Sequence, residues 1–267
     1  MNVIEAIILG IVQGATEFLP ISSSGHSVIV PALFNLSEPG LTLVAIAHQG
    51  TLLAVLLYFW SDLWAILRGV LQGLWQRQPL ATPPARLGWL ILAGSIPAAV
   101  AGLLFKDFFE EIFAEPRYAA LFLFGTALLL VMGERLRRGD KEISSLRLPD
   151  AMIVGFFQML ALFPGISRSG STITAGLMRG LDRETAARFS FLLGVPAIAG
   201  AGLLALRDVI AAGDLAANWT VYVATFVAAF LTGYACIYFL LAWLRRHSLY
   251  AFAVYCVLVA TVSLIFL

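Results

Sequence analysis

Two side chains of opposite charge stand inside apolar stretches of the sequence. Glu17 follows Gln13 by four residues, so both side chains lie on one face of a predicted helix. Arg168 stands in a second stretch of similar composition. An ionised group at membrane depth costs about 3 kcal/mol or more, so each of them needs a partner, a polar cavity or a ligand. The alternative for Glu17 is a charge near the membrane interface that accepts hydrogen bonds from a serine loop.

Histidines could add proton transfer to this chemistry. His26 follows a run of three hydroxyl side chains, Ser22, Ser23 and Ser24. An imidazole titrates near neutral pH and can also accept a phosphoryl group, so His26 is a candidate for either step. The alternative is a helix-capping or structural histidine. His48 could line the same cavity, but we expect it to bond a neighbouring backbone group instead.

Arg168 lies where a helix is expected to restart after a proline and a glycine. Its guanidinium stays charged and binds phosphate or carboxylate through two parallel donors. Ser167, Ser169 and Thr172 lie close to it in the sequence, and hydroxyls and amides at a helix N-terminus form an anion site. The stretch therefore predicts binding of phosphate or carboxylate. An ion pair between Arg168 and Glu17 is the structural alternative, and the two interpretations are compatible.

The two stretches are copies of one another. A shift of 145 residues aligns Gly10–Val28 with Gly155–Ile173 without a gap, and seven of the 19 positions are identical. Each copy runs from an apolar helix pattern into proline, serine and glycine, and then back into apolar residues. Such a break inside hydrophobic sequence predicts a helix–loop–helix whose free backbone groups need protein or water around them.

The copies differ at the residues that could do chemistry. Glu17 aligns with Leu162, and Arg168 aligns with Ser23. The acid therefore occurs only in the first copy, and the guanidinium only in the second. This unequal filling of a repeated framework predicts one composite site where the two copies meet.

Composition places the protein in a membrane. Of the 267 residues, 60% are hydrophobic and 12% are charged, and the mean hydropathy is +0.91. A soluble domain has roughly 25% charged residues. The net charge of +1 argues against a nucleic-acid partner, which would require a basic face. The sequence therefore predicts an integral membrane protein built from helices.

Six segments come close to the roughly 20 apolar residues that a membrane-spanning helix needs. The two serine-rich stretches, 2–34 and 150–179, have only about 15 residues on each side of the break, which is too short for two crossings. We expect both to be re-entrant hairpins. The six predicted spans are 41–60, 87–105, 118–133, 189–206, 219–244 and 248–267.

Basic residues orient this arrangement, because cytoplasmic loops carry the excess of Lys and Arg. With re-entrant hairpins, 13 of the 17 basic residues fall on one side. The predicted fold is an all-α polytopic membrane protein of two inverted repeats, each a re-entrant helix-loop-helix plus three transmembrane helices. The repeats cover 1–135 and 149–267, and a cytoplasmic linker at 136–148 joins them. Broken helices in inverted repeats are typical of transporters.

Both serine-rich motifs resemble the signatures of the undecaprenyl-diphosphatase family, the bacitracin-resistance phosphatases of bacterial membranes. The first motif, QGATEFLPISSSGHS, begins at Gln13, and the second, PGISRSGST, begins at Pro164. The pair is highly specific, and the resemblance extends over essentially the whole chain. It implies hydrolysis of undecaprenyl diphosphate at the outer face of the cytoplasmic membrane, which recycles the lipid carrier for peptidoglycan. Membrane lipid would surround the polyprenyl tail.

The resemblance also implies roles for individual residues. Glu17, Ser23, His26 and Arg168 would be catalytic, and Glu17 would bind Mg²⁺ or Ca²⁺. The residues that bind substrate or phosphate would be Gln13, Ser22, Ser24, Ser167, Ser169 and Thr172. Gln13 stands where many members have Glu, so the second carboxylate of a metal site is missing. The nucleophile is left open among Ser23, His26 and a water, and so is a homodimer.

Two other functions compete with this one. Inverted repeats also fit a transporter or lipid flippase for an anionic, phosphorylated substrate, because fold alone does not fix function. An acid-phosphatase-like lipid phosphatase would share the Ser-Gly-His at Ser24–His26, but Thr174 stands where its second motif requires a histidine. Phosphate release that depends on Arg168 would separate a phosphatase from a transporter.

Overall fold

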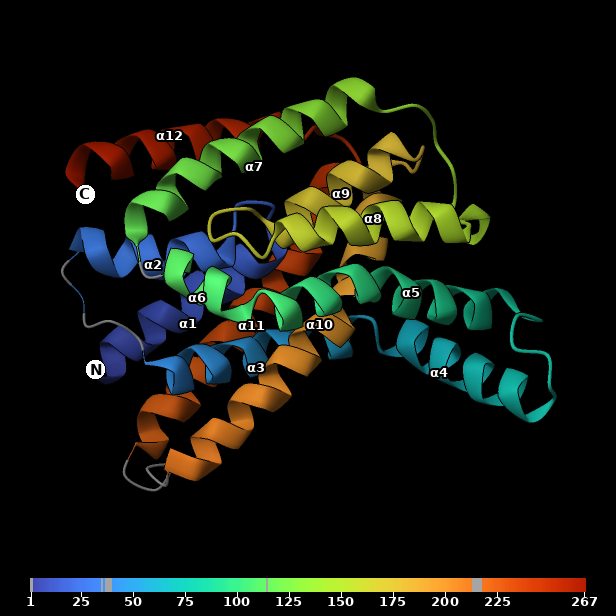
Figure 1. Cartoon of the computed structure of the whole chain (residues 1–267), viewed down its shortest axis with the longest axis horizontal. Helices are drawn as coiled ribbons and strands as arrows, with labels where there is room; N and C mark the ends of the chain where they lie inside the picture. The colour runs from blue at the N-terminus through green and yellow to red at the C-terminus, as the bar shows by residue number, and fades with distance from the viewer. Residues whose placement is uncertain (1, 35, 37–39, 114, 213–217) are drawn as a thin grey trace.

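The computed structural model describes residues 2–34, 36, 40–113, 115–212 and 218–267 (Figure 1). Within these ranges the chain forms α-helices, one short 3₁₀ helix and no named strand, which confirms the all-α prediction. The helices of the first half are α1 (Val3–Phe18), α2 (Ser23–Phe34), α3 (Leu41–Tyr58), α4 (Trp60–Trp75), α5 (Pro83–Leu104), α6 (Lys106–Phe113) and α7 (Pro116–Leu136). After the 3₁₀ turn Ile143–Ser145 come α8 (Leu148–Leu160), α9 (Arg168–Met178), α10 (Arg183–Ala212), α11 (Trp219–Leu244) and α12 (Tyr250–Phe266).

Both serine-rich stretches form the predicted helix–loop–helix, as α1–α2 and α8–α9. The α1 helix ends at Phe18 because Leu19 precedes a proline, which disfavours helical backbone angles. The chain restarts as α2 at Ser23, directly after Ser22, whose φ of +72° lies in the left-handed region. The loop between α8 and α9 turns at Gly165, whose φ of +94° suits a residue without a side chain.

Each predicted span coincides with a helix, but not every one of these helices qualifies as a span by itself. By length and apolarity, three of the described helices qualify as spans, namely α5, α7 and α11. The chain bends by 80° between α3 and α4, and these two helices qualify only as a bent pair. At the bend, Phe59 is buried with its ring centroid 6.2 Å from that of Phe191. Crossing of the membrane by α10 and α12 stays a prediction.

Helices of the first half of the chain pack mainly against helices of the second half. The α1 helix packs along α11 and α8 packs along α5, while α3 contacts α10 and α7 contacts α12 (Figure 1). A Cβ added to Gly10 would lie 2.5 Å from the carbonyl oxygen of Thr225 in α11. One added to the aligned Gly155 would lie 2.2 Å from that of Gly94 in α5. The shared glycines therefore permit close helix packing, whereas the boundaries of the inverted repeats stay a prediction.

Ion pairs hold together the edge of the molecule at which the second hairpin begins and ends. Arg179, which follows α9, donates to Asp150 at the start of α8, with 2.7 Å between Nε and Oδ1. The ends of the second hairpin are thereby tied together. Glu134 of α7 accepts from Arg183 of α10 at 2.5 Å and from the backbone N–H of Leu249 at 2.7 Å. These bonds link α7 to the start of α10 and to the start of α12.

The apolar core lies directly behind the first hairpin loop. Phe18 is fully buried, and its ring centroid lies 5.4 Å from that of Phe191 in α10, at an interplanar angle of 88°. A Cβ on Gly233 of α11 would lie 3.1 Å from the Phe18 ring. Because Phe18 directly follows Glu17, this packing fixes the position of the carboxylate at the end of α1.

Candidate active site

The two hairpin loops touch. Ser169 donates from Oγ to the carbonyl oxygen of Leu19 across 3.1 Å. A Cβ on Gly25 would lie 3.0 Å from the Cα of Gly165, so the absence of a side chain at these positions allows the close approach. Thr126 of α7 holds the second loop by donating to the carbonyl oxygen of Gly165 at 2.7 Å. The polar residues of the two copies are therefore brought together.

Four residues form what we call the carboxylate cluster: Gln13, Glu17, Ser23 and Arg168. The Glu17 side chain is only 7% exposed, and its Oε1 accepts from Arg168 Nη2 at 2.7 Å. Its Oε2 accepts from Ser23 Oγ at 2.7 Å and from Gln13 Nε2 at 3.0 Å. A buried carboxylate needs such partners, because an unpaired charge there is strongly destabilising. The ion pair that the sequence offered as an alternative is thus present, and it joins the two hairpins.

Arg168 is held by α10 as well as by Glu17. Its Nη1 donates to the carbonyl oxygen of Ser190 at 3.2 Å. Gly194 makes room for the guanidinium, since a Cβ there would lie 2.2 Å from Nη1. Ser167 caps α9 by accepting from the N–H of Gly170 at 3.0 Å. The guanidinium therefore belongs to the first residue of a helix, and the helix dipole favours an anion at this end.

The serines of the two loops form matching capping contacts. In the first loop, Ser22 Oγ accepts from the N–H of Gly25 at 3.2 Å and lies 3.2 Å from Ser24 Oγ. The aligned residues of the second loop repeat both contacts, at 3.0 and 3.1 Å: Ser167, Gly170 and Ser169. The identity of these positions in the repeat thus reflects the loop's own hydrogen bonds. Direct contact of these serines with phosphate stays a prediction.

Thr172 and Ser23 differ in how far their hydroxyls are available. Thr172 is buried, and its Oγ1 lies 2.6 Å from Ser190 Oγ and 2.8 Å from the carbonyl oxygen of Arg168. Ser23 is half-buried and bonds the carboxylate of Glu17. Among the predicted site residues that the structure describes, Ser23 is the half-buried hydroxyl in direct contact with that carboxylate.

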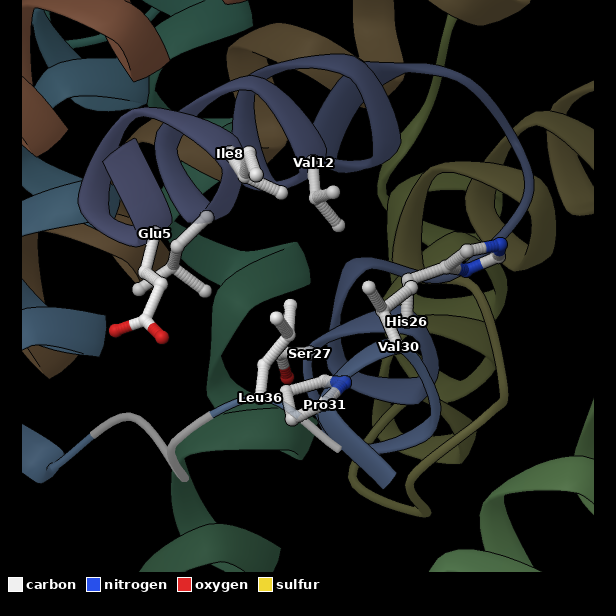
Figure 2. A pocket seen from close by; sticks show the side chains of 9 residues that line it. Glu5, Ile8, Val12, His26, Ser27, Val30, Pro31 and Leu36 are labelled. Carbon is white, nitrogen blue, oxygen red and sulfur yellow. The ribbon is translucent and has the colours of Figure 1, made fainter. Parts of the chain in front are cut away.

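His26 lies outside the carboxylate cluster. Its Nδ1 is 2.8 Å from the carbonyl oxygen of Ser22, and its Nε2 is 2.8 Å from the hydroxyl of Tyr255 in α12. Ser171, which aligns with His26, makes the equivalent bond to the carbonyl oxygen of Ser167 at 2.8 Å. His26 also borders a small cavity between α1 and α2 (Figure 2). Both ring nitrogens are thus occupied by contacts that hold the loop, and a chemical step at His26 stays a prediction.

His48 of α3 is the histidine that reaches the carboxylate cluster. Its Nδ1 lies 2.8 Å from the carbonyl oxygen of Val44, which is the backbone bond that we expected from the sequence. Its Nε2 faces Glu17, 3.9 Å from Oε2. Sequence reasoning offered a place at the same cavity for His48 only as the less favoured alternative, and it did not find the contacts of Tyr255 and Ser190. No local pattern signals them, because each partner lies on a helix distant in sequence.

The donor set for a metal ion is small. The described residues contain no group of three or more His, Cys, Asp or Glu side chains that could hold one. Glu17 offers a carboxylate whose two oxygens already accept hydrogen bonds, and Gln13 adds an amide oxygen. Mg²⁺ is often bound by one or two carboxylates together with substrate phosphates and waters. These residues therefore fit a cation that arrives with a phosphorylated substrate, and do not form a complete site by themselves.

Comparison with known proteins identifies the family. The family model described as bacitracin resistance protein BacA matches residues 6–262. A protein of Chlorobaculum parvum named undecaprenyl-diphosphatase is 51% identical over 259 residues, which cover 93% of this chain and 91% of the relative. Proteins of the same name from Thermomicrobium roseum and Methanosphaera stadtmanae are 44% and 42% identical, and the alignments cover 99% of this chain and 98% of each relative. The chain belongs to the bacitracin resistance protein BacA family.

Proposed function

We propose that this protein is a membrane phosphatase that hydrolyses undecaprenyl diphosphate to undecaprenyl phosphate and inorganic phosphate. Membership of the BacA family and the similarity to proteins named undecaprenyl-diphosphatase support this substrate. The single observation that carries the proposal is the Arg168–Glu17 pair, because it joins an anion-binding group to a base at the meeting point of two loops. The reaction would recycle the lipid carrier for cell-wall synthesis and give resistance to bacitracin.

Arg168 would bind the terminal phosphoryl group. In phosphoryl transfer the charge spreads over the equatorial oxygens, and two parallel guanidinium donors neutralise it. The Nη2 donor that now contacts Glu17 would turn to a phosphate oxygen, while Nη1 keeps its bond to Ser190. Backbone amides at the start of α9 would add to the anion site.

Glu17 would activate the nucleophile. Because Ser23 donates to the carboxylate at 2.7 Å, Glu17 can take the hydroxyl proton as the oxygen attacks the terminal phosphorus. An O–H bond breaks, an O–P bond forms, and the bond to the bridging oxygen breaks with its electron pair staying on the lipid monophosphate. Water then releases phosphate from Ser23, or attacks first in its place. His26 would contribute by holding the loop that presents Ser23.

A divalent cation is the proposed cofactor, as Mg²⁺ or Ca²⁺. Glu17 would hold it, with Gln13 beside it and with oxygens of the diphosphate completing the shell. When bound, the cation would neutralise charge on the diphosphate oxygens. Glu17 would then give up one of its present hydrogen bonds, and Arg168 would turn to the phosphate.

The protein is a multi-pass membrane protein by its apolar helices. We propose the cytoplasmic (inner) membrane, oriented so that most basic residues lie in the cytoplasm. The site would open to the outer side, as the resemblance to the phosphatase family implies. An apolar groove between α1, α2, α11 and α12 would take the polyprenyl tail; its lining includes Ile11, Ala15, Phe239 and Phe252. A homodimer is part of the proposal to be tested by the mass of the detergent-purified protein.

Phosphate release from undecaprenyl diphosphate by the detergent-purified protein tests the proposed function. Arg168→Ala is the informative variant, and Arg117→Ala is its control, since Arg117 is exposed on α7 and bonds the carbonyl oxygen of Leu267. We expect release by the wild type and the control, and loss by Arg168→Ala. Folded wild-type protein that releases no phosphate would contradict the proposed function and leave transport of the lipid as the next hypothesis.

A further inference from the structure

Thr126 of α7 bonds the second hairpin loop at two points, directly before Arg168. Its hydroxyl donates to the carbonyl oxygen of Gly165 at 2.7 Å and accepts from the backbone N–H of Ser167 at 2.8 Å. The side chain is buried, so water does not compete for these bonds. A hydroxyl offers one hydrogen and two lone pairs, so a side chain of this size needs a hydroxyl to make both contacts.

The α7 helix leaves the loop no room to move toward it. A Cβ on Gly165 would lie 2.2 Å from the carbonyl oxygen of Ala119 in α7. One on Gly125 of α7 would lie 2.7 Å from Cδ1 of Ile166 in the loop. Because helix and loop approach this closely, packing as well as hydrogen bonding fixes the separation between the Thr126 hydroxyl and the loop peptides.

The first loop has a weaker contact at the corresponding place. Pro20 aligns with Gly165 in the repeat, and the carbonyl oxygen of Pro20 lies 4.0 Å from Sγ of Cys256 in α12. A thiol is a weak hydrogen-bond donor, whereas a hydroxyl is a good one. The strong contact of Thr126 is thus found at the loop that leads to the guanidinium. It belongs to the differences between the two copies and not to their shared framework.

The two bonds of Thr126 act on Arg168 through Ser167. Ser167 is the N-cap of α9 and accepts from the N–H of Gly170 at 3.0 Å, and Arg168 is the first residue of this helix. A shift of the Ser167 peptide would therefore move the guanidinium and the first backbone amides of α9 together. Donors aimed at the charge of a transition state lose their effect when they are misplaced, and an error of about 1 Å costs about a hundredfold in rate.

We propose that Thr126 is a positioning residue of the phosphatase, a role that rests on the proposed function. It sets where the Arg168 guanidinium and the amides at the start of α9 lie relative to the terminal phosphoryl group. Thr126 itself does not touch the substrate. Without its hydroxyl, Arg168 would be displaced from the position that the transition state requires, while Glu17 and Ser23 would keep their contact with each other.

The test compares Thr126→Val with Thr126→Ser and Thr225→Val in the full-length, detergent-purified protein. The values of kcat and KM for phosphate release from undecaprenyl diphosphate are measured together with the unfolding temperature. Valine keeps the shape of threonine and removes the hydroxyl, whereas serine keeps the hydroxyl. Thr225 is the matched control, since it is buried in α11 and its hydroxyl donates to the carbonyl oxygen of Ala6 in α1 at 3.3 Å.

We expect Thr126→Val to lower kcat about a hundredfold with less than about threefold change in KM, because the displaced donors fail the charge of the transition state. Thr126→Ser should keep kcat within about threefold of the wild type, since its hydroxyl can make both bonds. Thr225→Val should keep the kcat and KM of the wild type, whatever it changes in the unfolding temperature.

Thr126→Cys is a milder variant, because it gives the second loop the kind of contact that Cys256 gives the first. Its thiol still forms a weak bond, so this variant should fold even where the valine variant does not, with kcat about tenfold below the wild type. A wild-type kcat in Thr126→Cys or in folded Thr126→Val would overturn the proposal, and so would an equal fall of kcat in Thr225→Val. Absence of release by the wild type would instead contradict the proposed function, and this inference with it.

Discussion

The α1–α2 and α8–α9 hairpins share a framework and differ in their chemistry. Gly10 and Gly155 press against backbone of another helix in the same way, and the capping serines make the same bonds in both loops. Yet Glu17 occurs only in the first hairpin and Arg168 only in the second, and the two side chains bond each other. The shared glycines and capping serines therefore serve packing and capping, whereas the charged groups of the site stand at unequal positions and only Gln13 joins them from a shared one.

The buried amide of Gln158 shows one consequence of the difference between the two hairpins. Gln13 donates to Glu17, but Leu162 stands at the position of Glu17 in the second hairpin. The aligned Gln158 is buried, and within the described residues neither its Nε2 nor its Oε1 has a hydrogen-bond partner. The second hairpin thus retains the framework glutamine without the acid that gives it a partner in the first.

The largest loss of activity is expected when Glu17 is replaced by leucine, the residue at the aligned position of the second hairpin. Glu17→Leu should lower kcat/KM by about a thousandfold or more, because the base and the partner of Arg168 are lost together. It should also destabilise the protein by about 3 kcal/mol, since the partly buried guanidinium of Arg168 loses its carboxylate and keeps the bond to Ser190. Phosphate release and thermal unfolding in detergent measure the two effects.

The double variant Glu17→Leu/Arg168→Ser separates these effects. Without an unpaired charge it should regain most of the lost stability and remain inactive. A double variant as unstable as Glu17→Leu would show that the ion pair is not what the single change disrupts.

Metal removal comes next in size. EDTA should lower phosphate release about a hundredfold, and Mg²⁺ or Ca²⁺ should restore it, because the cation neutralises the diphosphate. The unfolding temperature in EDTA should stay unchanged, since the described residues alone form no metal cluster. Full turnover in EDTA would remove the metal from the mechanism, and a large loss of stability would point to a structural ion instead.

The framework glycines should affect stability more than chemistry. Gly155→Ala should cost about 1–3 kcal/mol, because its Cβ would meet the carbonyl oxygen of Gly94 at 2.2 Å. Gly200→Ala is the matched control, since none of the atoms that the structure describes lies within 4 Å of a Cβ at that exposed helical position. Chemical denaturation in detergent compares the two variants. Equal stability of Gly155→Ala and the wild type would contradict close packing of α8 on α5.

The smallest effect is expected at the contact of His26 with α12. Tyr255→Phe removes the hydroxyl that lies 2.8 Å from Nε2 of His26, which should cost about 1 kcal/mol of stability. Phosphate release should fall by less than about tenfold, since the ring stays stacked. Tyr118→Phe on the exposed face of α7 serves as the control. A loss as large as that of Arg168→Ala would instead give Tyr255 a direct part in the reaction.

Local sequence patterns predicted the hairpins well, because proline, serine and glycine act on the backbone within a few residues. The sequence also predicted the ion pair between Glu17 and Arg168 as one alternative, because each charge occurs in only one of the two copies. The bend between α3 and α4 was not predicted, because the residue at the bend, Phe59, packs against Phe191 of the distant helix α10. The approach of His48 to Glu17 depends on how α3 docks between α1, α10 and α11, which no spacing within α3 reveals.

A double-mutant cycle on phosphate release tests the composite site most directly. Wild type, Glu17→Gln, Arg168→Ala and the double variant are compared in kcat/KM for undecaprenyl diphosphate, each checked for its unfolding temperature. Two groups that act as one unit give losses that do not add, so the double variant should be about as slow as the slower single variant. Losses that multiply across the two hairpins would contradict a single site built from both.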